Sequence, residues 1–190
     1  MFVGRKEELE LLKELRQKKA ASLVCLLGRR RIGKSRLIAE FGKSSESYIS
    51  IQGLGPDRNP SNKDQLKHFS EKLAQYFKTG VELFTDWDQA FYSLAAKTSK
   101  GSHVILLDEI SWMGGKDELF SARLKDAWDS HFKNNPKLIL VLCGSVSSWI
   151  EDNLLNNTSF AGRVSLALNL GELSLKEINY FWDQSNYHFG

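Results

Sequence analysis

Eight residues, Gly28 to Ser35, constrain the fold of this chain more than any other feature of its sequence. They read GRRRIGKS and match the pattern G-x-x-x-x-G-K-[ST] in full. The preceding run, Leu23 to Leu27 (LVCLL), is short, continuous and apolar, which predicts a strand buried on both faces of a parallel sheet. The following run, KSRLIAEF, is rich in helix formers and stops at Gly42. The sequence therefore predicts a strand, a glycine-rich turn and a helix in succession.

This succession is the context that a phosphate-binding loop requires. Glycines in such a loop let backbone N–H groups wrap around phosphate oxygens, and the next helix points its N-terminus at the anion. Lys34 would reach the β and γ oxygens of a nucleotide, and the Ser35 hydroxyl would ligate Mg²⁺. The alternative is a strand-to-helix turn whose basic side chains are merely solvated. The residues expected to bind the nucleotide are Arg30, Arg31, Ile32, Gly33, Lys34, Ser35 and Arg36.

A second segment, His103 to Glu109 (HVILLDE), places two acids at the end of another buried-type strand. Ligands bind at the carboxyl ends of the strands in open α/β sheets. We predict that Asp108 holds Mg²⁺, often through water, as the acid of this strand does in related ATPases. Glu109 is placed to accept a proton from the attacking water as a general base. Such a pair can also be a solvated turn, but the phosphate loop upstream favours the catalytic interpretation.

Ser145 comes after a third apolar run, Leu138 to Cys143 (LILVLC), and Gly144. In ATPases that insert a strand between the two strands of the phosphate site, a polar residue here bonds the γ-phosphate or the attacking water. A serine before a helical segment is also a common helix cap. Both roles stay open for Ser145, and one side chain can serve both.

Strand-like and helix-like segments alternate along the whole chain. Further strands are expected at Ser47 to Ile51 and Val164 to Leu168, which makes five core strands. Helical periodicity covers 5–19, 63–77, 87–96, the run through Leu119 and Phe132, and 146–155. The alternation predicts an α/β fold, a three-layer αβα sandwich with helices on both faces of a five-stranded parallel sheet. The segment from Trp112 to Gly115 is predicted to be a flexible loop. Its aromatic residue, Trp112, either contacts a partner or packs into the core.

Composition and charge limit the partners of the chain. The formal net charge is +3, and the one dense basic stretch lies inside the phosphate motif, so composition gives no strong case for DNA. Cys25 and Cys143 each lie in an apolar run and are expected to be buried thiols. The N-terminus has no apolar signal region, and no segment approaches the ~20 apolar residues of a membrane span. We therefore expect a soluble cytoplasmic protein that makes no membrane contact.

Four motifs, in this order, resemble those of one assemblage of ATPases. The opening, Phe2 to Leu9 (FVGRKEEL), looks like the hydrophobic-hydrophobic-Gly-Arg-x-x-Glu-Leu start of AAA+ and STAND ATPases. Phe160 to Arg163 (FAGR) resembles the Gly-Arg element that follows the sensor strand in the archaeal-type ATPases of that assemblage. The resemblance covers nearly the whole chain. It implies a P-loop NTPase core with the strand order 5-1-4-3-2.

The resemblance also implies roles for residues outside the phosphate loop. Arg163 would meet the γ-phosphate of its own or a neighbouring subunit, as arginine fingers do. An arginine that enters a strand can equally pair with an acid, for example Glu172. Four residues of the opening motif would border the adenine of ATP or ADP: Phe2, Val3, Gly4 and Arg5.

The chain departs from the family pattern at its C-terminus. In the family, the core is followed by a helical lid and often by a winged helix. Here residues 1–172 form the expected core, and only 173–190 begin a lid. A lid that is mostly absent predicts weak nucleotide affinity and slow turnover. It also indicates a gene fragment whose missing C-terminal region can mediate self-association or bind a partner protein.

The leading functional prediction is an ATPase that couples the binding and hydrolysis of Mg-ATP to a conformational change. The alternative is a nucleotide-operated switch or a DNA-linked regulator with negligible hydrolysis, as in STAND and initiator relatives. A small-molecule or nucleotide kinase shares the phosphate loop. The adjacent Asp108 and Glu109 and the Gly-Arg opening disfavour a kinase.

Overall fold

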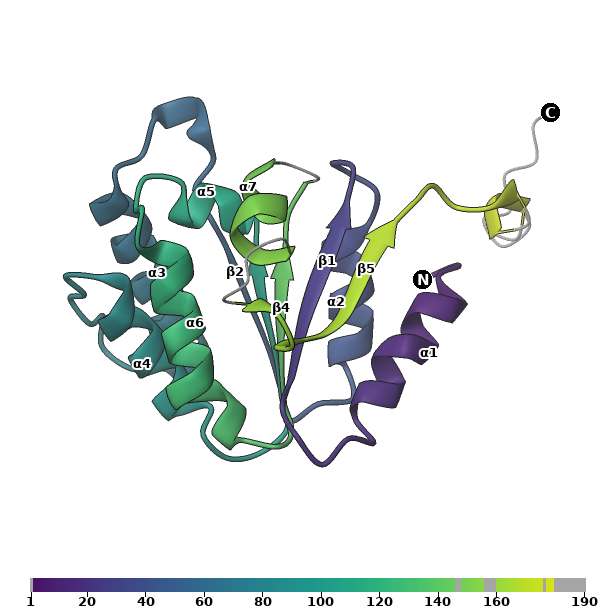
Figure 1. The fold of residues 1–190 in the computed structure, drawn as a ribbon, viewed down its shortest axis with the longest axis horizontal. Coiled ribbons are helices and arrows are strands. Elements are labelled where there is room, and N and C mark those ends of the chain that lie inside the picture. Colours follow the sequence, from purple (N-terminus) through teal and green to yellow (C-terminus); the bar gives the residue numbers. More distant parts are fainter. Residues whose placement is uncertain (1, 146–147, 156–159, 176, 180–190) are drawn as a thin grey trace.

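A five-stranded parallel sheet organises the chain, as Figure 1 shows. The computed structural model describes residues 2–145, 148–155, 160–175 and 177–179. The strands are β1 (Ser22–Gly28), β2 (Ser47–Gln52), β3 (His103–Asp108), β4 (Leu138–Cys143) and β5 (Val164–Leu170). Their order is β2-β3-β4-β1-β5, which is the expected order 5-1-4-3-2 read from the opposite edge, and every neighbouring pair is parallel. The predicted fold class is therefore confirmed.

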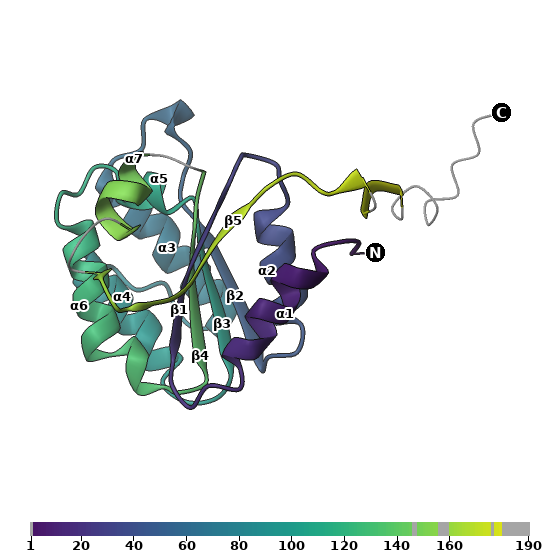
Figure 2. The same cartoon turned by 45° about the vertical axis from the view of Figure 1, so that its right-hand side comes forward.

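Helices cover both faces of this sheet, and Figure 2 separates the two layers. On one face lie α1 (Lys6–Leu15) and α2 (Lys34–Gly42), and on the other lie α3 (Asn62–Phe77), α4 (Trp87–Lys97) and α6 (Phe120–Ser130). Each face has an apolar core of its own, because successive side chains of a strand point to opposite faces. In β1, the larger core receives Leu23, Cys25 and Leu27, and the smaller one receives Val24 and Leu26.

A polar cap and an aromatic cluster fix the larger helical layer. Ser61 and Asp64 form a capping box before α3, in which Ser61 Oγ accepts from Asp64 N at 3.2 Å and Asp64 Oδ2 accepts from Ser61 N at 2.8 Å. The ring of Trp87 lies edge-on to Phe69 and Phe120, with centroid distances of 5.4 and 4.9 Å. These rings join α3, α4 and α6 into one layer.

Short helical segments connect the larger elements: η1 (Pro56–Arg58), α5 (Ile110–Gly114), η2 (Phe132–Asn134), α7 (Ser148–Ile150) and the π-helical η3 (Glu151–Leu155). The expected flexible loop from Trp112 to Gly115 is wrong in part, since Trp112, Met113 and Gly114 belong to α5, which the buried Ile110 and Met113 hold in place. The first helix ends at Leu15, short of the expected residue 19. Residues 17–20 are exposed, so no packing holds a further turn there.

A new helical pattern begins after β5, as the sequence predicts. Leu175 and residues 177–179 are helical, and Ser174 Oγ accepts from Glu177 N at 3.3 Å, as a helix cap does. Residue 176 and residues 180–190 lie outside the described residues, so the division into a core and a lid stays a prediction. Within the described part of the chain, no helix is both long and apolar enough to cross a bilayer.

Candidate functional site

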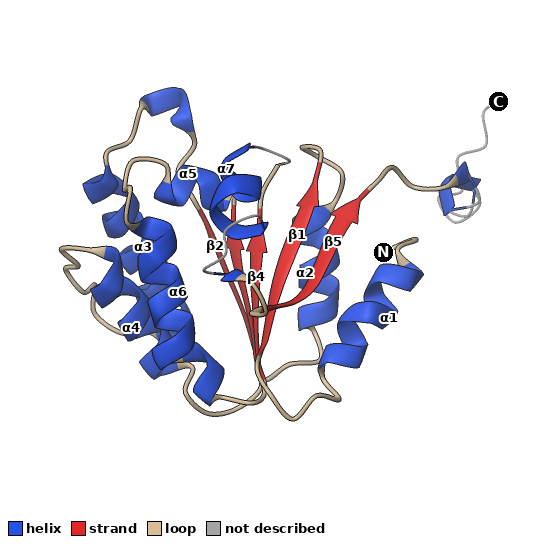
Figure 3. Cartoon of the chain, viewed as in Figure 1, coloured by secondary structure: helices blue, strands red, loops and turns tan. Residues whose placement is uncertain are grey.

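Most of the predicted site residues lie where β1, β3 and β4 end, at the carboxyl end of the sheet. Figure 3 shows the strands ending together there. β4 lies between β1 and β3, so the phosphate loop and the acidic pair leave the sheet two strands apart. A cleft of about 320 Å³ opens between them. Its lining comprises Arg30, Arg31, Gly33, Lys34, Ser35, Arg36, Gln52, Asp108, Glu109 and Trp112.

The loop from Gly28 to Ser35 wraps around its own lysine. Lys34 Nζ donates to the carbonyl oxygens of Gly28 at 2.8 Å and of Arg29 at 2.9 Å, and the side chain is buried. Both glycines are required by the backbone. Gly28 has φ 147° and a Cβ there would lie 2.7 Å from the carbonyl oxygen of the neighbouring strand β5, while Gly33 has φ 96° at the N-cap of α2.

Ser35 and Asp108 are in direct contact across the cleft. Ser35 Oγ donates to Asp108 Oδ2 at 2.6 Å, and Asp108 Oδ1 accepts from the backbone N–H of Glu109 at 3.0 Å. The described residues contain no cluster of three or more His, Cys, Asp or Glu side chains that could hold a metal by itself. Mg²⁺ in nucleotide sites takes one or two protein oxygens and fills its octahedron with phosphate and water. A hydroxyl beside a carboxylate fits that donor set.

Glu109 is held in an unusual backbone conformation at the head of α5. Its φ of 49° lies in the left-handed region, which is uncommon outside glycine and concentrates at functional sites. Its carbonyl oxygen accepts from the N–H groups of Trp112 at 2.9 Å and Met113 at 3.2 Å. Ser145 Oγ lies 3.5 Å from Glu109 Oε2, and only 8% of Glu109 is exposed. The structure thus brings Ser145 and Glu109 together.

The N-terminal motif touches the phosphate loop through Arg5. Arg5 Nη2 donates to Gly171 O at 2.6 Å and to Ile32 O at 3.3 Å, and Arg5 N donates to Glu177 Oε1 at 2.6 Å. Hydrogen bonds from Ser174 and from the Arg5 amide hold the pKa of the Glu177 carboxyl below its usual value. A hollow of about 730 Å³ adjoins this contact.

The hollow has Gly4 and Arg5 in its lining, whereas Phe2 is half-buried and packs against the smaller core. Val3 is half-buried as well. The structure therefore brings part of the opening motif beside the phosphate loop. Its contact with adenine stays a prediction.

Arg163 does not join the cleft. Its Nε donates to Asp129 Oδ1 at 2.9 Å and its Nη2 to Asp129 Oδ2 at 2.7 Å. Val164 pairs with Leu23 and Leu170 pairs with Gly28, so Arg163 precedes β5 at the end of the sheet opposite to the phosphate loop. The expectation that Arg163 reaches the nucleotide of its own chain is corrected by this register. A contact with a neighbouring subunit stays a prediction.

Sequence reasoning missed three side chains around the cleft. Gln52 ends β2 in register with Asp108, a position that a polar residue at the end of SYISIQ could have indicated. The ring of Trp112 lies under the guanidinium of Arg30, whose Cζ is 5.1 Å from the ring centroid. Gln65 of α3 binds the backbone of Trp112 and Leu54, and no local sequence signal points to it.

The fold and this cleft define a P-loop ATPase domain of the AAA+ assemblage. The chain belongs to the family described as the ATPase domain predominantly from Archaea, whose model matches residues 2–186.

Two proteins from Methanocaldococcus jannaschii are similar to this chain. The uncharacterized protein MJECL04 is 26% identical over 187 residues, which are 97% of this chain and 39% of that protein. The uncharacterized ATP-binding protein MJ0423 is 54% identical over 41 residues, which are 22% of this chain and 70% of that protein. The chain thus spans less than half of the longer relative.

Solved structures share the fold at low identity. The Walker-type ATPase PABY2304 of Pyrococcus abyssi has a TM-score of 0.66 and 19% identity, with 100% of this chain and 60% of that chain covered. The Aeropyrum pernix ORC1 protein in complex with DNA has a TM-score of 0.60 and 15% identity, with 97% of this chain and 49% of that chain covered. These two likenesses bear on the fold alone.

Proposed function

We propose that this domain binds Mg-ATP in the cleft between Lys34 and Asp108 and hydrolyses it, with hydrolysis coupled to a conformational change. The observation that carries the proposal is the 2.6 Å hydrogen bond between Ser35 Oγ and Asp108 Oδ2. It joins the two motifs that a magnesium nucleotide has to bridge. ADP is the product held in the same cleft.

In this proposal each part of the phosphate site has one task. The backbone of the loop and Lys34 bind the β and γ phosphates, and Ser35 and Asp108 hold Mg²⁺. Bound Mg²⁺ neutralises charge that develops on the phosphate oxygens during transfer. Gly4, Arg5, Phe2 and Val3 border the adenine. The 3.3 Å bond from Arg5 to Ile32 O supports this neighbourhood, because it joins the opening motif to the loop.

Glu109 is the general base of the proposed reaction. It follows the metal-binding Asp108 directly, and its side chain lines the same cleft. The 3.5 Å contact with Ser145 supports a shared task, in which the hydroxyl orients either the carboxylate or the attacking water. Ser145 therefore acts as a sensor of the reacting group.

Conformational coupling is supported by the way α5 is built. Glu109 begins this helix, and the N–H groups of Trp112 and Met113 bond its carbonyl oxygen. Gln65 Nε2 of α3 donates to Trp112 O at 3.0 Å. In this proposal, a movement of the Glu109 backbone is passed to α5 and, through Gln65, to α3.

The test is phosphate release from Mg-ATP by the parent chain and by Glu109→Gln. Loss of the base is expected to lower kcat by about 10²–10⁴-fold while ATP still binds, because the amide keeps the shape but cannot take a proton. Glu118→Gln is the matched control, since Glu118 is an exposed acid nine residues further on and outside the cleft. Equal rates for Glu109→Gln and the parent would show that the base is assigned wrongly.

A nucleotide-operated switch or DNA-linked regulator is the second candidate. It rests on the fold shared with the Aeropyrum pernix ORC1 protein, whose structure contains DNA. A gel shift with duplex DNA at low salt, with and without Mg-ATP, separates the candidates. Nucleotide-dependent DNA binding without phosphate release favours the regulator, and phosphate release without DNA binding favours the ATPase.

A further inference from the structure

Arg30 projects from the phosphate loop over the ring of Trp112, with its guanidinium carbon 5.1 Å from the ring centroid. Both side chains line the cleft that Lys34, Asp108 and Glu109 also line. A cation over an indole face is attracted by the ring quadrupole, and Trp is the strongest partner for this contact. The stack therefore fixes where the charge of Arg30 lies relative to the acidic pair.

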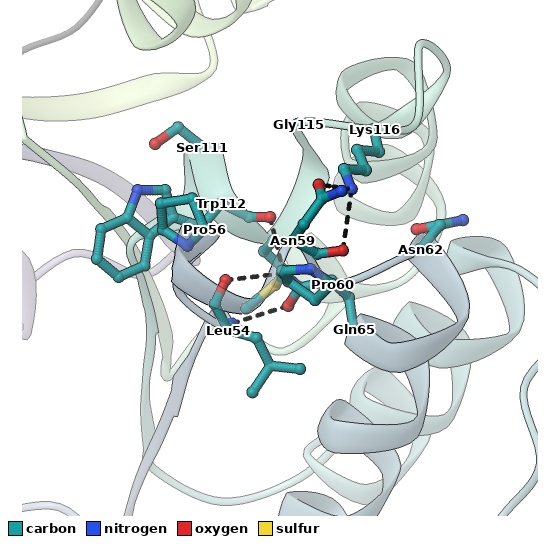
Figure 4. Close-up of a pocket in the computed structure, with 11 residues that line it drawn as sticks. Leu54, Pro56, Asn59, Pro60, Asn62, Gln65, Ser111, Trp112, Gly115 and Lys116 are labelled. Atoms are coloured by element: carbon teal, nitrogen blue, oxygen red, sulfur yellow. Dashed lines mark hydrogen bonds between the residues drawn. The ribbon is translucent and has the colours of Figure 1, made fainter.

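Two hydrogen bonds hold the backbone of Trp112, and its ring lies beside a loop. Its N–H donates to the carbonyl oxygen of Glu109 at 2.9 Å, and its own carbonyl oxygen accepts from Gln65 Nε2 at 3.0 Å. Figure 4 shows Gln65 bonded to both Trp112 and Leu54, which ties α5 to the loop after β2. A Cβ at Gly55 of that loop would lie 3.5 Å from Cζ3 of the indole. The backbone of Trp112 is therefore anchored to α3, and its ring lies beside the loop after β2.

The contact between Arg30 and Trp112 is a cation–π contact and not a hydrogen bond, so it needs none of the N–H donors of Arg30. A guanidinium contacts an aromatic ring with its face, and its N–H donors lie in the plane, pointing outward. Within the described part of the chain, no carboxylate lies within 4.0 Å of Arg30, whereas Arg29 lies 3.5 Å from Glu172 and Arg163 is bonded to Asp129. Planar donors of this kind match phosphate oxygens in pairs.

The position of Arg30 selects one phosphate among the three. Gly33 and Lys34 lie where the loop enters α2, and Lys34 is buried, whereas Arg30 is exposed. Trp112 lies on α5, which starts at the proposed base Glu109, so its ring and the guanidinium belong to the wall where water attacks. The phosphate nearest to that wall is the terminal one.

We propose that Arg30 binds the terminal phosphate of ATP in cis and that Trp112 is the positioning residue that presents its guanidinium. This inference deepens the proposed function and rests on it. Arg30 would then supply the arginine that Arg163 does not supply within its own chain. It would also be the residue through which the site distinguishes a triphosphate from a diphosphate.

The test is isothermal titration of the parent and its variants with a non-hydrolysable ATP analogue and with ADP, both with Mg²⁺. Arg30→Ala is expected to weaken binding of the analogue by about tenfold and binding of ADP by less than about twofold. The reason is that only the analogue has the third phosphate. The affinity of Arg30→Lys for the analogue is expected to lie between those of the parent and Arg30→Ala, since lysine keeps the charge and loses the planar fork.

Arg29→Ala is the matched control for charge. It removes the same charge one residue away from a side chain that is directed at Glu172 and is 84% exposed. Its ratio of analogue to ADP affinity is expected to stay near that of the parent. A ratio lowered as much as in Arg30→Ala would overturn the inference, because long-range charge alone would then explain both.

Variants of Trp112 test the positioning role. Trp112→Ala is expected to lower the ratio by about threefold, and Trp112→Phe is expected to restore most of it, because an aromatic face supports the guanidinium again. A parent-like ratio in a folded Trp112→Ala, checked by its melting temperature, would overturn the positioning role. Failure of the parent to bind either nucleotide would overturn the proposed function itself. Binding of both, with Arg30→Ala weakening them equally, would overturn this inference alone.

Discussion

The hydroxyl of Ser35 lies 2.6 Å from Oδ2 of Asp108, although 73 residues separate them in the sequence. The contact exists because β1 and β3 are parallel and both end at the same edge, with β4 between them. In the proposed site, both oxygens would face Mg²⁺, with the hydroxyl keeping its proton and turning it away from the carboxylate. The proposal therefore predicts that nucleotide binding depends on magnesium.

Metal dependence is the first consequence. Ser35→Ala and Asp108→Asn are each expected to weaken ATP binding in the presence of Mg²⁺ by about tenfold or more. The first removes the hydroxyl ligand, and the second removes the negative charge that attracts the metal. Binding measured in EDTA is expected to change little. Titration with ATP with and without Mg²⁺ checks this, with the exposed Asp126→Asn as a control. Equal losses in both conditions would argue against a metal at this contact.

Ser145 is expected to affect turnover more than binding. Ser145→Ala should lower kcat by about tenfold with little change in KM, because the hydroxyl acts on Glu109 or on the attacking water and not on the ground-state phosphates. Ser145→Thr keeps the hydroxyl and should retain most of the rate. Steady-state phosphate release measures both. A rise in KM at constant kcat would instead indicate uniform binding by this residue.

The ion pair between Arg163 and Asp129 predicts a pH-dependent contribution to stability. The hydrogen bonds from Arg163 hold the pKa of the Asp129 carboxyl below its usual value. The pair therefore stabilises the fold at pH values above the pKa of this carboxyl in the unfolded chain. The stabilisation is lost as the pH falls through its pKa in the folded chain. Asp129→Asn should lower the melting temperature by roughly 1–4 °C at neutral pH, since the pair is partly exposed.

The difference between Asp129→Asn and the parent should shrink in acid, where both side chains are neutral. Melting curves from pH 7 down to about pH 3 measure it. A constant difference across this range would show that the substitution acts through packing and not through the charge of Asp129.

The two cysteines are expected to be unreactive in the folded chain. Burial raises the pKa of Cys25 to about 12 and raises that of Cys143 further. A thiol reagent at pH 8 should label neither in buffer and both in denaturant, because only a thiolate reacts. Because the thiol pKa values are raised in the folded chain, its stability is expected to fall as the pH rises above the usual pKa of a cysteine. Rapid labelling in buffer would contradict the burial of both residues.

The strands and the pairing of the two site motifs could be predicted because each is a local pattern with one structural meaning. LVCLL and HVILL are too short and too apolar for surface helices, and parallel strands bring their carboxyl ends together. Asp108 and Ser35 therefore had to lie at one edge once both strands were recognised. Burial of Cys25 and Cys143 followed from the same runs.

Features that depend on packing between distant residues could not be predicted. The FAGR motif places Arg163 at the start of a strand, but its acid is Asp129 on α6, 34 residues earlier, and not Glu172. α5 is only five residues long, too short for a helical period to show. The stack of Arg30 on Trp112 joins the loop after β1 to that same short helix. Each of these contacts is set by the assembled sheet.

The most direct test of the whole account is the binding of Mg-ATP to the parent chain and to Lys34→Ala by isothermal titration. The parent is expected to show one saturable site. Lys34→Ala should show a loss of about a hundredfold or more, since in the proposed site the lysine would make charge-assisted bonds to two phosphates. Lys18→Ala removes an exposed charge that precedes β1, whereas the loop follows that strand, and it should bind like the parent. Equal affinity of Lys34→Ala and the parent would contradict the assignment of this cleft as the ATP site.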